Sequence, residues 1–433
     1  MLDIQFIRDN RDLVETKSRQ KGYEVNIHRL LQLDEERRSL ITAVETLRRR
    51  RNEHSDKIKH HGKPEAGIIE QGRAIKAELS QSEERLKGVE HDFEQLIKAV
   101  PNMPLDDVPL GMSEDENKVA KRVGEPLNYD FVPRHHWQIA EPRNLIDKER
   151  AAKISGSRFA YIKGDLVRLQ FAIIQFVLQT LGDEVVLERL IQDNNLNLHP
   201  RAFMPILPPA MLRTEPYVAS ARLDAENLTY KIVQDDLWLN ASAEHTLCTM
   251  YWEEILPEEM LPIRYIGYST SFRREAGTYG KDTEGILRMH QFDKLEMEVF
   301  STPETGLDEH LLLVAIQEYL VQQLNLPYQV LQKCTADIGK PNARGVDIEC
   351  WFPAQGKYRE THTADFMTDY QARDLRIRVR RKKGTVELVH TNDATAFALG
   401  RIMAAIMENN QTQDERIIVP EVLRPFMCGQ AEI

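Results

Sequence analysis

The chain has 433 residues, 42% of them hydrophobic, and carries a formal net charge of −11. This length predicts more than one domain, and the acidic balance argues against a protein that binds nucleic acid over its whole surface. No apolar run is long enough to span a membrane and the charged N-terminus lacks a signal-peptide core, so we expect a cytoplasmic protein without a membrane partner.

Residues 27–100 are rich in charge and poor in turn formers. From Ile75 to Val100, apolar residues recur at alternating spacings of four and three, which is the heptad pattern of a coiled coil. A rougher seam precedes it, and Gly62 and Pro64 separate the two stretches. We therefore predict an antiparallel hairpin of two helices, each of about 34 residues and about 50 Å long.

The first of these helices carries a run of four arginines, Arg48, Arg49, Arg50 and Arg51. In most proteins such a run is a solvated face of a coiled coil. It can also follow the phosphates of a polynucleotide. The hairpin by itself does not decide between these two interpretations.

A proline-rich stretch ends the second helix after Val100. Beyond it, apolar runs of strand length alternate with helical segments such as residues 166–181. This alternation predicts an α+β fold with a mostly antiparallel sheet flanked by helices. The chain is accordingly expected to divide into residues 1–110 and 111–433.

The segment 271–298 surrounds a glycine-containing turn with charged residues. Its glycines do not match the GxxxxGK[ST] phosphate loop, so any phosphate here must be bound by side chains. Arg273 and Arg288 suit that task, because a guanidinium stays charged and meets two oxygens at once. The alternative is a charged hairpin on the surface.

Two C-terminal segments carry further candidates. Glu360 is a candidate carboxylate ligand for Mg²⁺, and Thr363 follows closely. Residues 389–411 have the composition of an apolar helix of small residues that carries one arginine, Arg401. A buried charge on such a helix needs a partner, which is either a protein carboxylate or a bound phosphate.

Together these segments resemble the seryl-tRNA synthetases, a family of class II aminoacyl-tRNA synthetases. FRREAGTYGKDTEGILRMHQFDKLE, within 271–298, is similar to the family's motif 2, and residues 390–410 are similar to its motif 3. MPILPP, within 204–212, lies where motif 1 is expected. MLDIQFIRDNRDLV and the helical hairpin resemble its tRNA-binding arm, so the resemblance covers nearly the whole chain.

The resemblance implies a tRNA-binding domain over residues 1–110 and a class II catalytic domain over residues 111–433. It implies a ligase that forms seryl-adenylate and pyrophosphate from serine and ATP. The seryl group then passes to the 3′ end of tRNA(Ser), with tRNA(Sec) left open as a second acceptor. The enzyme is expected to be a homodimer that needs Mg²⁺ with ATP. The four widely separated cysteines give no reason to expect zinc.

The resemblance also assigns roles to residues. Arg273 and Arg401 are the expected catalytic residues, because negative charge accumulates on the phosphates in the transition state. Glu275 is expected to accept from the adenine amino group and Phe292 to stack on the ring. Arg288 is expected to join Arg401 on the outer phosphates. The expected ATP site comprises Arg273, Arg274, Glu275, Arg288, Phe292, Glu360, Thr361, His362, Thr363 and Arg401, with Glu360 and Thr363 binding Mg²⁺.

The expected serine pocket is small and contains carboxylates, which suits an α-ammonium group and a hydroxyl group. Hydrogen bonds to that hydroxyl can reject alanine by a factor on the order of 10⁴. The resemblance implies that the pocket comprises Ser242, Ala243, Glu244, Arg273, Glu296, Asp393 and Thr395. It also implies that Arg48 to Arg51 bind tRNA.

The chain departs from the family pattern at several positions. Ser242 replaces a threonine, Asp365 and Phe366 lie where the family has SSCSNC, and Asp393 replaces an asparagine. Asp393 adds a negative charge beside the amino-acid pocket unless it is paired or protonated. Local repacking is the favoured explanation, and a changed amino-acid substrate with a side-chain amine is the alternative. Residues 182–203 form a longer segment than the family usually has, with no function assigned.

Two other classes of protein remain open. A related ligase that aminoacylates a carrier protein is expected to lack the long arm and to use a zinc pocket. A non-catalytic paralogue is expected to lose some of the charged site residues. All five are present in this chain: Arg273, Glu275, Arg288, Glu360 and Arg401.

Overall fold

The computed structural model describes residues 1–60, 66–223, 228–275 and 284–433, which form two compact units, Met1–Met103 and Pro104–Ile433. This boundary lies before the one predicted after residue 110, because residues 104–110 pack on the second unit. The backbone N–H of Leu105, for example, donates to the carbonyl oxygen of Ala343 at 2.9 Å. The predicted breakers Gly62 and Pro64 and the glycines of residues 276–283 lie outside the described ranges.

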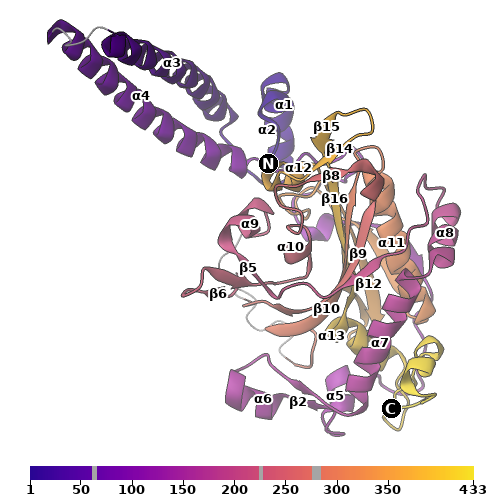
Figure 1. The fold of residues 1–433 in the computed structure, drawn as a ribbon. Helices are drawn as coiled ribbons and strands as arrows, with labels where there is room; N and C mark the ends of the chain where they lie inside the picture. Colours follow the sequence, from indigo (N-terminus) through magenta and orange to yellow (C-terminus); the bar gives the residue numbers. More distant parts are fainter. Residues whose placement is uncertain (61–65, 224–227, 276–283) are drawn as a thin grey trace. The chain divides into compact units, whose positions relative to one another are not determined.

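The first unit consists of α1 (Ile4–Asp9), α2 (Arg11–Gln20), α3 (Ile27–His60) and α4 (Ala66–Ala99). Helices α3 and α4 lie side by side and run in opposite directions (Figure 1), and each contains 34 residues. Their seam buries Val44, Leu47 and Leu79, with Leu86 packed against them. The predicted two-helix hairpin is therefore confirmed.

Charged contacts support the hairpin at two levels. Across it, Arg48 pairs with Glu83 at 2.7 Å and Arg85 pairs with Glu36 at 2.5 Å. At its base, the buried carboxylate of Asp34 forms ion pairs with three arginines, Arg8 of α1 and two residues of α3 itself, Arg37 and Arg38. The base is consequently joined to α1, whereas the distal part is held mainly by contacts between the two long helices.

The second unit contains an eight-stranded sheet in which only the β4–β9 pair is parallel. The predicted α+β fold with a mostly antiparallel sheet is confirmed. In spatial order the strands are β1 (Lys118–Val123), β11 (Tyr328–Gln332), β12 (Arg344–Phe352), β13 (Lys357–Thr368), β16 (His390–Ala398), β10 (Gln291–Ser301), β9 (Ile263–Phe272) and β4 (Met204–Ile206).

Among the described residues of this unit there are also three smaller sheets and further helices. The sheets join β2 (Ile146–Asp147) with β3 (Tyr161–Ile162), β5 (Met211–Arg213) with β7 (Leu237–Leu239) and β6 (Lys231–Ile232), and β15 (Val386–Leu388) with β14 (Arg378–Arg380) and β8 (Ile255–Pro257). The α-helices are α5 (His136–Ala140), α6 (Lys148–Ser155), α7 (Asp165–Leu181), α8 (Glu184–Asp193), α9 (Thr214–Ala219), α10 (Glu244–Leu247), α11 (Gly306–Gln323), α12 (Tyr370–Leu375) and α13 (Leu399–Asn409). Short 3₁₀ helices are η1 (Glu114–Glu116), η3 (Glu258–Met260) and η4 (Glu421–Met427).

The main core forms where α11 and α13 pack on the large sheet and α7 packs on α13. Residues 182–203, which had no assigned function, contribute α8, whose Leu187, Leu190 and Ile191 are buried in this core. Within the described ranges no single helix is long and apolar enough to cross a membrane. Helices α7 and α8, bent by 71°, reach that length and composition only as a pair.

One predicted element is wrong. Residues 389–411 were expected to form one helix, but His390–Ala398 form strand β16 and helix α13 begins at Leu399. Strand β16 is paired on both sides, with β10 and β13, so tertiary pairing overrides the local preference of its alanines. The strand places Asp393 and Thr395 on the sheet, and the helix that follows carries Arg401.

Candidate functional site

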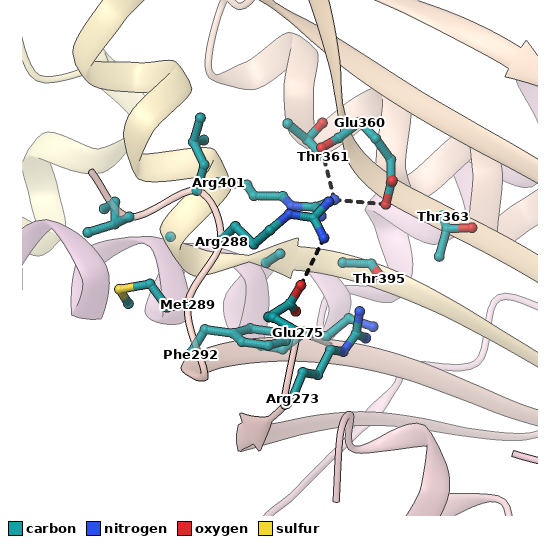
Figure 2. A pocket seen from close by; sticks show the side chains of 15 residues that line it. Arg273, Glu275, Arg288, Met289, Phe292, Glu360, Thr361, Thr363, Thr395 and Arg401 are labelled. Atoms are coloured by element: carbon teal, nitrogen blue, oxygen red, sulfur yellow. Dashed lines mark hydrogen bonds and ion pairs between the residues drawn. The ribbon is translucent and has the colours of Figure 1, made fainter. Parts of the chain in front are cut away.

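A cavity of about 100 Å³ opens between the ends of β9 and β10 and the strands β13 and β16. Figure 2 shows Phe292 and Arg273 on one side of it and Glu360 with Thr363 on the other. Many of the predicted ATP-binding residues line this cavity: Arg273, Glu275, Arg288, Phe292, Glu360, Thr361, Thr363 and Arg401, with Lys294 and Thr395. The structure thus brings together residues from three segments that are far apart in the sequence.

Two arginines project into the cavity, and each is paired with a carboxylate (Figure 2). Arg288 Nη1 donates to Glu275 Oε2 at 2.8 Å, and Arg401 Nη1 donates to Glu360 Oε1 at 2.8 Å. Glu360 is therefore the protein carboxylate that faces the charge of Arg401. The ion pairs orient both guanidinium groups in the cavity. Because the side chains are only partly buried, both groups remain accessible to an anionic ligand.

Arg273 lies directly after β9, where the cavity meets the residues predicted to bind the amino acid. Its Nε donates to the carbonyl oxygen of Ala241 at 3.1 Å, and its guanidinium lies 5.3 Å from the centre of the Phe292 ring. The first contact ties Arg273 to the segment that contains Ser242. The second places it beside the ring that is predicted to stack on adenine.

The Glu360 wall of the cavity offers oxygen ligands that fit a magnesium ion. Burial raises the pKa of Glu360. The positive charges of Arg401 and Lys333 outweigh this effect and lower the pKa to about 2, so the carboxylate is ionised at neutral pH. The buried Oγ1 of Thr363 has no hydrogen-bond partner in the described part of the chain. A carboxylate and an unsatisfied hydroxyl on one wall are the hard oxygen donors that Mg²⁺ prefers.

Asp347 and Lys333 lie beside this wall and were not identified from the sequence. Asp347 is opposite Thr363 in the β12–β13 register, and Lys333 Nζ lies 3.7 Å from its carboxylate. Burial raises the pKa of Asp347 to about 7 even though Lys333 opposes the shift. The strand register between β12 and β13 is the signal that would have revealed them, and it is not readable from one sequence.

Ser242 and Glu296 lie together beside the cavity, and Thr395 lines it. Glu296 is opposite Thr395 in the β10–β16 register, and Ser242 Oγ donates to Glu296 Oε2 at 3.1 Å. Lys294, on the same strand as Glu296, lines the cavity and pairs with Glu296. Lys294 is a further residue that sequence reasoning missed.

Asp393 has a partner that the sequence did not predict, Arg222. The two form a short ion pair, and Arg222 Nε also lies 3.6 Å from Glu244 Oε1. Burial raises the pKa of Asp393 above its ordinary value, and the positive charge of Arg222 opposes this shift. The charge at this position is therefore compensated within the protein, which supports local repacking over a changed amino-acid substrate.

Glu298 adds another buried carboxyl group to this region. It lies opposite Asp393 in the β10–β16 register, is fully buried, and neither of its carboxylate oxygens has a hydrogen-bond partner among the described residues. Burial, reinforced by the nearby Asp393, raises the pKa of Glu298 well above its ordinary value. Folding therefore favours the protonated form of Glu298.

Replacing Glu298 by methionine is expected to stabilise the protein. When folding raises the pKa of a carboxyl group, the free energy of unfolding falls as pH rises above the unfolded pKa of about 4.3. The reason is that the unfolded chain releases the proton in this pH range more readily than the folded protein does. The gain should therefore grow between about pH 4 and pH 8, by roughly 1.4 kcal/mol for each unit by which folding raises the pKa within this range. Calorimetric melting at the two pH values measures it.

The exposed Glu188 of α8 provides the control, because Glu188→Met makes the same chemical change without the burial. Its melting temperature should shift little at either pH. A Glu298→Met variant that melts below the unmodified protein at pH 8 would contradict the inference that the buried carboxyl is a net cost.

Some predicted residues lie away from the cavity. Arg274 is exposed, and its backbone N–H donates to the carbonyl oxygen of Leu228. His362 is buried, with its ring 5.2 Å from that of Phe397, and does not line the cavity. Ala243 is buried at the start of α10, so it can contribute only its backbone to the amino-acid pocket.

Comparison with known proteins gives matches over the whole chain. Residues 1–104 match the model of the seryl-tRNA synthetase N-terminal domain, and residues 229–410 match that of the class II tRNA synthetase core domain (G, H, P, S and T). The chain is 39% identical to a serine–tRNA ligase of Thermodesulfovibrio yellowstonii and 38% identical to one of Symbiobacterium thermophilum, over at least 99% of each chain. A crystal structure of a seryl-tRNA synthetase from Pyrococcus horikoshii complexed with ATP is similar with a TM-score of 0.87 and 34% identity. That alignment covers 100% of this chain and 99% of the other.

Proposed function

Because the chain belongs to the seryl-tRNA synthetase family of class II aminoacyl-tRNA synthetases, we propose that it activates serine with ATP and transfers the seryl group to tRNA(Ser). The observation that carries this proposal is the grouping of five charged residues around one cavity: Arg273, Glu275, Arg288, Glu360 and Arg401. A non-catalytic paralogue has no need to retain this grouping. The reaction uses tRNA, and its proposed location is the cytoplasm.

In the first step, a serine carboxylate oxygen attacks the α-phosphorus of ATP, and pyrophosphate leaves. No protein nucleophile or general base is required, so the protein acts by positioning and by stabilising charge. Arg273 is placed to contact both reactants, because it lies between Phe292 and the Ala241–Ser242 segment. Arg288 and Arg401 are proposed to exchange part of their carboxylate contacts for the outer phosphates.

Glu360 and Thr363 are the residues proposed to hold the magnesium ion that accompanies ATP. Such an ion would neutralise part of the phosphate charge. In the second step, the terminal hydroxyl of tRNA attacks the seryl carbonyl carbon and AMP leaves. Arg48 to Arg51 on the hairpin are proposed to contact tRNA phosphates.

The serine pocket is proposed to use Ser242 and Glu296 for the α-ammonium group, and Thr395 with Glu296 for the side-chain hydroxyl. All three are buried, so a substrate without the hydroxyl leaves buried polar groups unpaired. This is the physical basis for rejecting alanine. The pairing of Asp393 with Arg222 supports serine rather than an amino acid with a second amine.

The enzyme is proposed to be a homodimer joined near residues 204–212. Strand β4 is the edge of the large sheet, and the apolar residues Met204, Leu207 and Met211 are 62%, 78% and 43% exposed around it. An exposed apolar edge of this kind is typical of a subunit interface. Sedimentation velocity measures the mass, and a monomer at micromolar concentration would overturn this proposal.

Amino-acid-dependent exchange of pyrophosphate into ATP tests the proposed function. We expect serine to support exchange, EDTA to abolish it and added Mg²⁺ to restore it. Purified tRNA(Ser), and not a carrier protein, should then accept the seryl group. Exchange with another amino acid and none with serine would show that the pocket has changed its substrate.

A further inference from the structure

Lys294 occupies a position that deepens the proposed function. Its Nζ donates to Ser242 Oγ at 3.1 Å and forms an ion pair with Glu296. Ser242 and Glu296 are the same two groups proposed to bind the α-ammonium group of serine. The ammonium group of Lys294 thus makes the contacts that are assigned to the α-ammonium group of the substrate.

The three side chains of this arrangement are buried. Lys294 is 4% exposed, and Ser242 and Glu296 are 0% exposed, while Lys294 alone of the three lines the cavity. Ser242 Oγ also donates to Glu296 Oε2, and Glu296 Oε1 has no hydrogen-bond partner among the described residues. Lys294 is therefore the member of this group that a ligand in the cavity meets directly.

The two ammonium groups cannot share the same contacts. Like charges held a few ångströms apart in a buried site repel strongly, because little solvent is present to screen them. Ser242 Oγ has two lone pairs, and Lys294 Nζ already occupies one of them, so a single acceptor position is left for a second donor. Binding of the substrate ammonium at Ser242 and Glu296 thus requires that the Lys294 ammonium leave.

A second carboxylate is placed to receive it. Glu244 Oε2 lies 4.0 Å from Lys294 Nζ, so a change of about one ångström would form a hydrogen bond. Glu244 Oε1 faces His245 Nε2 at 3.2 Å and Arg222 Nε at 3.6 Å, which orients Oε2 toward the lysine. Burial raises the pKa of Glu244, but Arg222 and His245 outweigh this effect and hold the pKa below its ordinary value. This carboxylate is therefore ionised.

We propose that Lys294 occupies the α-ammonium subsite of the free enzyme and that the bound amino acid displaces it onto Glu244. Lys294 is then a positioning residue that competes with the substrate. It keeps the buried carboxylate of Glu296 paired until an amino acid arrives. The apparent dissociation constant for serine includes the fraction of enzyme in which the lysine has already moved.

Calorimetric titration with serine, without ATP, tests this proposal, which rests on the proposed function. Lys294→Met keeps the length of the side chain and removes its charge, and should lower the dissociation constant by about tenfold if the lysine blocks nine-tenths of the free enzyme. Lys294→Gln should act in the same direction. Glu244→Gln removes the ionised acceptor and should weaken serine binding.

The double variant Lys294→Met/Glu244→Gln separates displacement from direct contact. Without the lysine, Glu244 has nothing to receive, so the double variant should bind serine as tightly as Lys294→Met. Lys153→Met provides the control for loss of one charge, since Lys153 pairs with Glu149 on the surface of α6. It should bind serine like the unmodified protein.

Two outcomes would overturn the proposal, and a third would overturn only the proposed function. Unchanged or weaker serine binding by folded Lys294→Met and Lys294→Gln would mean that the substrate ammonium binds elsewhere, for example at Glu296 Oε1. Weaker binding by the double variant than by Lys294→Met would make Glu244 a direct serine ligand. If the unmodified protein binds another amino acid and not serine, the proposed function fails, and the same titrations with that amino acid still decide the role of Lys294.

Discussion

Replacing Arg273 by alanine is expected to reduce serine-dependent pyrophosphate exchange by more than about a hundredfold while leaving the protein folded. Arg273 contacts the Ala241 carbonyl and lies beside Phe292, so it is positioned where the serine carboxylate and the α-phosphate would meet. Negative charge increases there as pyrophosphate leaves. Removing an oriented cation from such a site costs roughly 3 kcal/mol or more of transition-state stabilisation.

Arg401→Ala should have a comparable effect on exchange, because Arg401 is the cation that faces Glu360 across the cavity. The exposed Arg416 provides the control, since it also pairs with carboxylates, Asp414 and Glu432, but on the surface. Arg416→Ala should retain normal exchange. Near-normal exchange by folded Arg273→Ala or Arg401→Ala would show that ATP binds at a different place.

Removing the distal part of the hairpin is expected to abolish tRNA charging and to leave serine-dependent pyrophosphate exchange largely unchanged. The structure limits the deletion to residues 41–89, joined by a short glycine–serine linker. The base must remain, because Asp34 joins α3 to Arg8 of α1. The deleted part contains the seam of Val44, Leu47 and Leu79, which is a separate cluster within the hairpin.

Two measurements identify the cause of this loss. Filter binding should show greatly weakened tRNA affinity in the truncated protein. Replacing Arg48, Arg49, Arg50 and Arg51 by glutamine should weaken binding partially and reduce its salt dependence, because fewer counterions are released. Among single replacements, Arg48→Gln should reduce tRNA affinity least, because Arg48 already pairs with Glu83. A truncated protein that charges tRNA normally would make the hairpin a structural element.

The amino-acid pocket illustrates how far sequence reasoning could go. The order of Ser242, Glu296 and Thr395 along the chain matched a family pattern, and the structure brings these residues together. Asp393 was recognised as a departure, but its consequence could not be derived. Its partner Arg222 is 171 residues away, and nothing in the local sequence of either residue identifies the other.

Features that depend on local spacing and on the order of motifs could be read directly from the amino-acid sequence. The heptad repeat predicted the hairpin because a helix repeats its faces every few residues, so neighbours in sequence are neighbours in space. The arginines of motifs 2 and 3 were identified from the resemblance of their segments to a family's motifs, whose order can also be read along the chain. Tertiary structure alone decided that His390–Ala398 form a strand, that Glu298 is buried opposite Asp393, and that Lys294 lies on Glu296. Strand pairing and buried ion pairs join distant parts of the chain, and their energies depend on burial that only the complete fold creates.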